Sequence, residues 1–225
     1  MVDVVKRRGR RMGWQRGERR GPLGQAALRY AGMGWPVCAG AHLRHGGPDS
    51  GRACSCDRVG CPAPGAHPVS PAWQMQATTD PAVVSGWWES QPDANVILVT
   101  GRVFDVLDVP ARAGAAALAA MGRSGVPAGP VAKAGDRMLF FVATRGAPDD
   151  EDEWWSCHLD CEPESVTEEG SVRWHCRDSY VPAPPSRTGP GVASRWVRDP
   201  EGHPLPDALR LLEFLADACE EAVAQ

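Results

Sequence analysis

Residues 95–109 read NVILVTGRVFDVLDV, and this stretch decides the fold class. β-Branched and other apolar side chains dominate both halves, which predicts two buried β-strands over 95–100 and 103–109. Gly101 lies between the two halves. A single glycine does not establish a hairpin, so the pairing of the two strands stays open.

Helical and strand patterns mix on both sides of this stretch. The sequence predicts helices over 24–33, 80–90, 113–122 and 206–223, and further strands over 35–39, 131–134, 137–143, 172–176 and 179–183. Asp80 followed by Pro81 is a typical helix start. This mixed order predicts an α+β (mixed α/β) domain with a β-sheet core flanked by helices.

The charge is uneven along the 225-residue chain, which has a net charge of −4. Residues 1–22 hold eight basic and two acidic residues, and the remaining 203 hold 16 basic and 26 acidic ones. We predict a basic, disordered arm over 1–22 and a single domain over 23–225. A solvated tail without a partner is the favoured interpretation of the arm, and binding of DNA or RNA through it is the alternative.

No apolar run approaches the roughly 18 to 20 residues that cross a bilayer, and the basic N-terminus has no apolar stretch behind it. We therefore expect no membrane partner and a cytoplasmic location. Eight cysteines in such a chain argue against a disulfide framework and favour metal binding or burial.

The segment 44–72 is rich in Gly, Pro, Cys and His and is predicted to be an irregular insertion. Four candidate metal ligands fall within 14 of its residues, namely Cys54, Cys56, Cys61 and His67. Thiolate and imidazole ligands suit tetrahedral zinc, so we predict a structural zinc site. Cys38 and His42 compete for the fourth position, and free thiols in a loop are the alternative.

A second group contains Cys157, His158, Cys161, His175 and Cys176. His175 and Cys176 are neighbours, so on a strand they would point to opposite faces. We therefore favour buried or surface thiols here over a second metal site.

Three separated segments resemble one family. They are residues 26–37 (AALRYAGMGWPV), 73–100 (WQMQATTDPAVVSGWWESQPDANVILVT) and 178–186 (DSYVPAPPS). In this order they resemble the N-terminal domain of bifunctional DNA primase/polymerases, the prim-pol branch of the archaeo-eukaryotic primase superfamily. The resemblance covers about residues 24–200 and implies a primase-like sheet core with the Cys/His-rich segment as an insertion.

In that family a strand presents Asp-x-Asp, whose two carboxylates hold divalent metals for nucleotide transfer. Asp108 matches the first acid, but Pro110 stands at the second position and has no ligand atom. Asp105 is an odd number of residues away, so we expect it to face the other side of the strand.

The family also carries a histidine that contacts the nucleotide phosphates after a Gly-rich turn. Met138 takes its place here, while the neighbouring Arg137 is the candidate phosphate contact. A third family acid precedes the Tyr-Val-Pro-Pro segment, where we find Arg173 and His175, with Asp160 and Asp178 as stand-ins.

The resemblance, with these departures, predicts a catalytically degenerate prim-pol domain that binds nucleic acid or a protein and is stabilised by Zn²⁺. One alternative is an active primase/polymerase that uses Mg²⁺ or Mn²⁺ on rearranged acids such as Asp105, Asp108 and Asp160. Another is a protein-interaction module with no nucleic-acid role. The tryptophans Trp87, Trp88, Trp154, Trp155, Trp174 and Trp196 are expected to pack in a core or against a partner.

Overall fold

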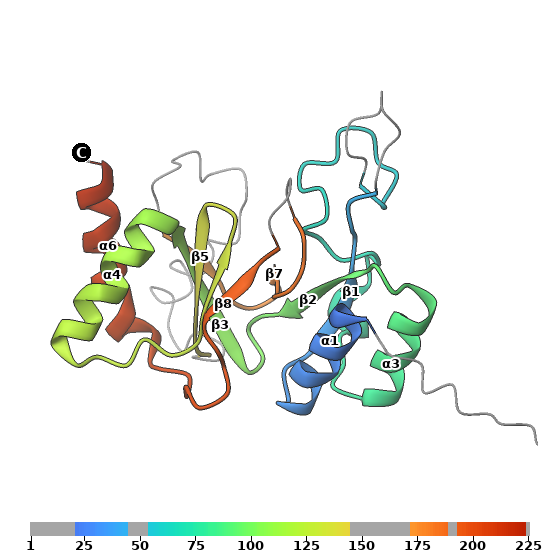
Figure 1. The fold of residues 1–225 in the computed structure, drawn as a ribbon, viewed down its shortest axis with the longest axis horizontal. Coiled ribbons are helices and arrows are strands. Elements are labelled where there is room, and N and C mark those ends of the chain that lie inside the picture. The colour runs from blue at the N-terminus through green and yellow to red at the C-terminus, as the bar shows by residue number, and fades with distance from the viewer. Residues whose placement is uncertain (1–20, 45–53, 145–171, 189–192, 224–225) are drawn as a thin grey trace, which may run out of the picture.

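The computed structural model describes residues 21–44, 54–144, 172–188 and 193–223. These residues form two antiparallel sheets flanked by helices, which confirms the mixed α+β class (Figure 1). The small sheet has the order β1 (Val37–Gly40), β2 (Asn95–Val99), β7 (Tyr180–Pro182). The large sheet has the order β6 (Arg173–His175), β3 (Phe104–Pro110), β5 (Arg137–Ala143), β4 (Val131–Ala134), β8 (Arg195–Arg198).

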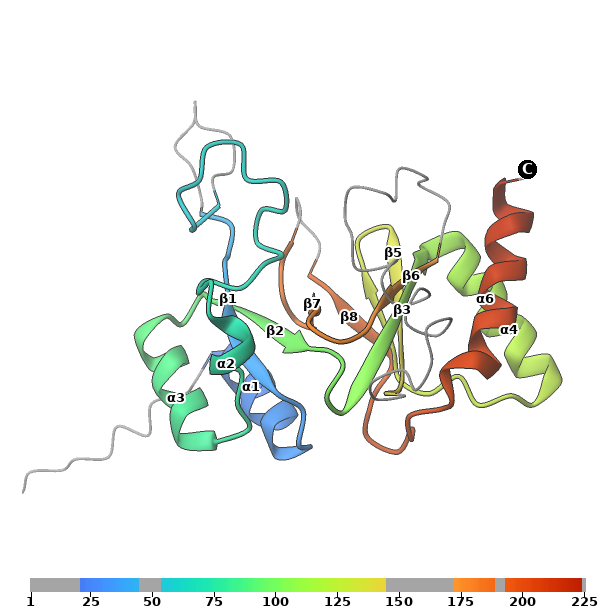
Figure 2. The ribbon, with the colours of Figure 1, turned by 180° about the vertical axis from the view of Figure 1, so that it is seen from behind.

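The helices gather at the two ends of the molecule. Near the small sheet, α1 (Pro22–Gly32) packs against α3 (Pro81–Ser90), with the short α2 (Trp73–Gln76) close by. At the other end, α4 (Ala111–Ser124) and α6 (Ala208–Val223) lie side by side against the large sheet (Figures 1 and 2).

The chain passes from the small sheet to the large one at Gly101. The two strands of the deciding stretch, β2 and β3, do not pair with each other, because each belongs to a different sheet. Gly101 has φ +77°, and a Cβ there would lie 2.2 Å from the Cα of Arg177. Glycine is therefore required at this crossing.

Strand β3 is buried on both faces, so its side chains divide between two cores. Phe104 and Val106 join a core with Trp35 and the helices α1 and α3, while Leu107 and Val109 face the core under α4 and α6. Asp108 lies on the face of Phe104 and Val106, towards the end of the strand.

Most elements lie close to their predicted places. Asp80 accepts a hydrogen bond from the Ala82 amide (2.8 Å), and Asp207 accepts from the amides of Leu209 and Arg210, so both helix starts are capped as expected. Strands β4 and β5 pair around Gly135, as predicted. The sequence did not predict α2 or β8.

The tryptophan prediction holds where the structure describes the ring. Trp88 and Trp174 are buried, and Trp196 packs near Phe141 with ring centroids 5.1 Å apart. Residues 1–20 of the predicted arm, together with Trp154 and Trp155, lie outside the described residues. In the part of the chain that is described, no helix has the length and apolar character needed to span a membrane.

Candidate functional site

The predicted zinc ligands come together in one group. One ligand atom from each of Cys54, Cys56, Cys61 and His67 lies within 4.8 Å of every other. His67 Nε2 is 3.3 Å from Cys54 Sγ and 3.5 Å from Cys61 Sγ. Tetrahedral zinc with Zn–S of about 2.3 Å and Zn–N of about 2.0 Å places sulfur and nitrogen about 3.5 Å apart. The group can therefore hold a metal ion such as zinc.

The histidine ring is oriented for this role by its other nitrogen. His67 Nδ1 lies 2.8 Å from the carbonyl oxygen of Pro68. A carbonyl oxygen only accepts, so the proton is on Nδ1 and the lone pair of Nε2 points at the thiols. This is the tautomer that ligates a metal.

The electrostatics around Cys54 favour its thiolate. Burial raises the pKa of Cys54, but the amides of Cys56 and Gly65 and the side chains of Cys56 and His67 outweigh it and lower the value to about 6. The Gly65 amide lies 3.4 Å from Cys54 Sγ. A thiolate is the form that binds zinc.

The two competitors for the fourth position lie outside the group. Cys38 is on β1, buried against Ile97 and Val99, and burial raises its pKa to about 12. His42 is next to the loop, where its Nδ1 is buried and without a hydrogen-bond partner, but it is not among the four clustered ligands.

Asn95 links the loop of residues 54–68, which we call the metal loop, to the small sheet. Its Nδ2 donates to the carbonyl oxygens of Gly65 (2.8 Å) and Arg187 (2.9 Å), and its Oδ1 accepts from the Arg187 amide (3.0 Å). The loop also pairs with the end of β1, because the Ala41 amide donates to the His67 carbonyl (2.8 Å) and the Val69 amide donates to the Ala39 carbonyl (3.0 Å). Asn95 was visible in the sequence only as part of the segment 73–100, because its partners Gly65 and Arg187 lie far from it along the chain.

A second candidate site surrounds Asp108 on β3. The register places Leu139 of β5 on one side of it and Arg173 of β6 on the other. Alternation along the strands then brings Arg137 and His175 to the same face. We call Asp108, Arg137, Arg173 and His175 the Asp108 face.

Arg137 holds the carboxylate directly. Its Nε donates to Asp108 Oδ1 at 2.7 Å and its Nη2 donates to the Asp108 carbonyl oxygen at 2.9 Å. The exposed fractions of the two side chains are 16% and 9%, so solvent screens this pair weakly. Met138 points the other way, into the core under α4 and α6. The residue of β5 that faces Asp108 is therefore Arg137.

Strand β6 adds basic groups where the resemblance implies an acid. Arg173 lies opposite Asp108, and His175 Nε2 is 3.5 Å from Asp108 Oδ2. His175 Nδ1 is 3.0 Å from the Ser179 hydroxyl. Cys176 is buried in the opposite core, as expected for the neighbour of His175, while Cys157, His158 and Cys161 lie outside the described residues.

Asp105 faces away from Asp108, as its odd spacing predicts. Its Oδ2 accepts from Trp174 Nε1 at 3.2 Å, and its Oδ1 is buried without a hydrogen-bond partner. Burial raises the pKa of Asp105, while the hydrogen bond from Trp174 opposes the rise. Asp178 is exposed in a turn, and Asp160 lies outside the described residues.

The Asp108 face does not fit a pair of catalytic divalent ions. Two-metal chemistry needs carboxylates shared between ions about 4 Å apart. Among the described residues this face offers one carboxylate, and a guanidinium occupies one of its oxygens. Pro110, next along the same face, supplies no ligand atom. A positive charge about 4 Å from another costs about 4 kcal/mol at an effective dielectric constant of 20, so the arginines oppose a cation here.

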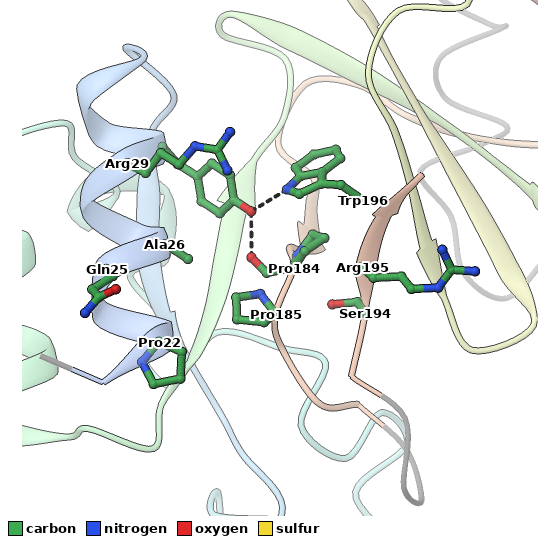
Figure 3. A pocket seen from close by; sticks show the side chains of 10 residues that line it. Pro22, Gln25, Ala26, Arg29, Pro184, Pro185, Ser194, Arg195 and Trp196 are labelled. Atoms are coloured by element: carbon green, nitrogen blue, oxygen red, sulfur yellow. Dashed lines mark hydrogen bonds between the residues drawn. The ribbon is translucent and has the colours of Figure 1, made fainter. Parts of the chain in front are cut away.

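A shallow cavity of about 420 Å³ lies elsewhere, between α1, the Pro184–Pro185 segment and β8 (Figure 3). In its wall, Tyr30 donates to the Pro184 carbonyl at 2.6 Å and accepts from Trp196 Nε1 at 2.8 Å. Its rim residue Arg29 is paired with Asp199 and Glu201. Its lining includes neither the metal ligands nor the Asp108 face, so we do not assign the cavity as the site.

One comparison with known proteins identifies a relationship. The family described as bifunctional DNA primase/polymerase, N-terminal (Prim-Pol) matches residues 27–208. That range holds both the Cys/His group and the Asp108 face. A search of curated proteins found no match to this chain.

Proposed function

The chain belongs to the bifunctional DNA primase/polymerase N-terminal family, and we propose that it is a catalytically inactive member that binds nucleic acid. In this proposal the Cys/His group holds a structural zinc ion that orders the loop around residues 54–68. The domain then serves as a binding module, with the large sheet presenting the Asp108 face.

The observation that carries the proposal is the contact between Arg137 Nε and Asp108 Oδ1. Nucleotidyl transfer by two metals requires carboxylates that are free to bind the ions. Here Asp108 is bound to an arginine, and the adjacent positions on its face carry Pro110, Arg173 and His175 rather than acids. Among the described residues, this face therefore lacks the groups that would neutralise a nucleoside triphosphate through metal ions or activate a primer hydroxyl.

The alternative of an active enzyme with rearranged acids receives little support from the described residues. Asp105 lies on the opposite face of β3, where it is bonded to Trp174. It therefore cannot share an ion with Asp108 without turning the strand over.

The test is nucleotide incorporation on a primed DNA template with Mg²⁺ or Mn²⁺. We expect no extension by the zinc-loaded protein, and the same result for Asp108→Ala and for Asp217→Ala, a matched change of an exposed acid on α6. Robust extension that Asp108→Ala abolishes and Asp217→Ala leaves intact would overturn the proposal.

A further inference from the structure

The side chains of the Asp108 face carry more positive than negative charge. The one carboxylate, Asp108, is compensated by Arg137 through Nε. Arg173 then remains, and among the described residues it has no acidic partner. His175 and the Ser179 hydroxyl lie beside it on the same side, 3.0 Å from each other.

Arg137 supplies a positive charge directly beside the Asp108 carboxylate. A divalent ion in such a site binds carboxylate oxygen and leaves positive charge for phosphate. The Arg137 guanidinium binds the carboxylate oxygen and also the Asp108 carbonyl, so two contacts fix it in place. Its positive charge belongs to the chain and needs no ion from solution.

We infer that the Asp108 face binds phosphate groups without a divalent metal, with Arg173, His175 and Ser179 as the contacting side chains and Arg137 as the fixed internal cation. This inference rests on the proposed function, since a working two-metal enzyme would need metal at the same face. A planar guanidinium matches phosphate oxygens, and hydroxyl and imidazole groups complete such a site.

The phosphate could come from nucleic-acid backbone or from a free nucleotide, and two probes separate these sources. Fluorescence anisotropy would follow a labelled single-stranded oligonucleotide and, separately, a labelled deoxynucleoside triphosphate. Each is titrated with full-length, zinc-loaded protein, with and without added Mg²⁺. Chelators are avoided because they would remove zinc from the Cys/His group.

We expect at least one probe to bind equally well without added Mg²⁺. Arg173→Ala should weaken that binding about tenfold, which is the effect of losing about one charge-assisted contact. His175→Ala should weaken it less. The matched control is Arg123→Ala, which removes one exposed positive charge from α4, a helix that covers the opposite face of the sheet.

Three results would overturn the inference. They are binding of neither probe, binding that appears only with Mg²⁺, and equal losses in Arg173→Ala and Arg123→Ala. Circular dichroism and thermal unfolding of each variant would show that it folds. Primer extension in the same samples reports on the proposed function separately, because extension overturns inactivity whereas the Arg173 comparison tests the phosphate contact.

Discussion

The metal loop lacks regular secondary structure but has a complete ligand set, whereas strand β3, which carries Asp108, is regular but lacks the second acid. Residues 54–68 contain no helix or strand, yet their four ligand side chains meet within 4.8 Å. Strand β3 is fully regular and pairs on both sides, yet it carries a single carboxylate on the face where the family resemblance implies two. Packing and strand pairing therefore hold β3 in place without a second carboxylate. The metal loop has little core of its own, so we expect its order to depend on its metal ligands.

Removing a ligand from the loop is the sharpest test of this comparison. Cys61→Ser should abolish stoichiometric zinc binding, since three ligands remain of a closed tetrahedral set. It should also lower the melting temperature, because zinc binding contributes to the free energy of folding. Metal analysis of the purified protein measures the first effect and calorimetry the second.

Two control cysteines accompany that variant. Cys219→Ala on α6 and Cys38→Ala on β1 should both retain about one equivalent of zinc, because neither belongs to the group. Zinc loss in Cys38→Ala would move the fourth ligand away from His67 and contradict the assignment.

The Asp108 strand should respond to loss of its acid in stability rather than in activity. Asp108→Ala leaves the weakly exposed Arg137 without its carboxylate, and we expect the free energy of unfolding to fall by about 3 kcal/mol. Denaturant unfolding measures it, with the exposed Asp217→Ala expected within about 0.5 kcal/mol of the parent protein. An unchanged stability in Asp108→Ala would show that the ion pair is not a structural replacement for metal.

Loss of Asn95, which links the metal loop to the small sheet, should have an intermediate effect on stability. Asn95→Ala removes three hydrogen bonds to Gly65 and Arg187, which should cost about 2 kcal/mol and speed zinc release to a coloured chelator. Asp93→Ala changes an exposed residue in the turn that precedes β2 and should do neither. Unchanged zinc release in Asn95→Ala would mean that the metal group is ordered independently of β2.

The smallest expected effect is the pH dependence that comes from Asp105. Burial raises its pKa in the folded protein above the usual 3.8, so the folded state binds the proton more tightly. Its contribution to stability is therefore complete below about pH 4 and is lost as the pH rises through the folded pKa. Asparagine does not titrate, so in Asp105→Asn the free energy of unfolding should fall by about 1 kcal/mol less as the pH rises. Denaturant unfolding at several acidic pH values measures this difference. An unaltered pH profile in the variant would contradict the assignment.

The sequence predicted the strands of the deciding stretch because apolar content and β-branching report burial directly. It also predicted the group of four candidate metal ligands, because cysteine and histidine close together in a glycine-rich loop can meet without help from the rest of the fold. It missed β8, whose alternation is carried by only four residues with exposed charges, and it missed the short α2.

Only part of the Asp108 face could be predicted from the sequence. Alternation alone showed that Asp105 and Asp108 face opposite sides and that Pro110 lacks a ligand atom. It did not show that Arg137 rather than Met138 faces the carboxylate, because that depends on the register between β3 and β5.

Most element types, the clustered Cys/His group and the lack of an acid at position 110 could be predicted from the sequence, because each depends on residues close together in the chain. The three-dimensional arrangement was needed to show that β2 and β3 separate into two sheets at Gly101, that Asn95 reaches Gly65, and that Arg137 and Arg173 meet at Asp108. These contacts join residues about 30 to 65 positions apart, and cross-strand register, which no local pattern encodes, sets the pairing at Asp108.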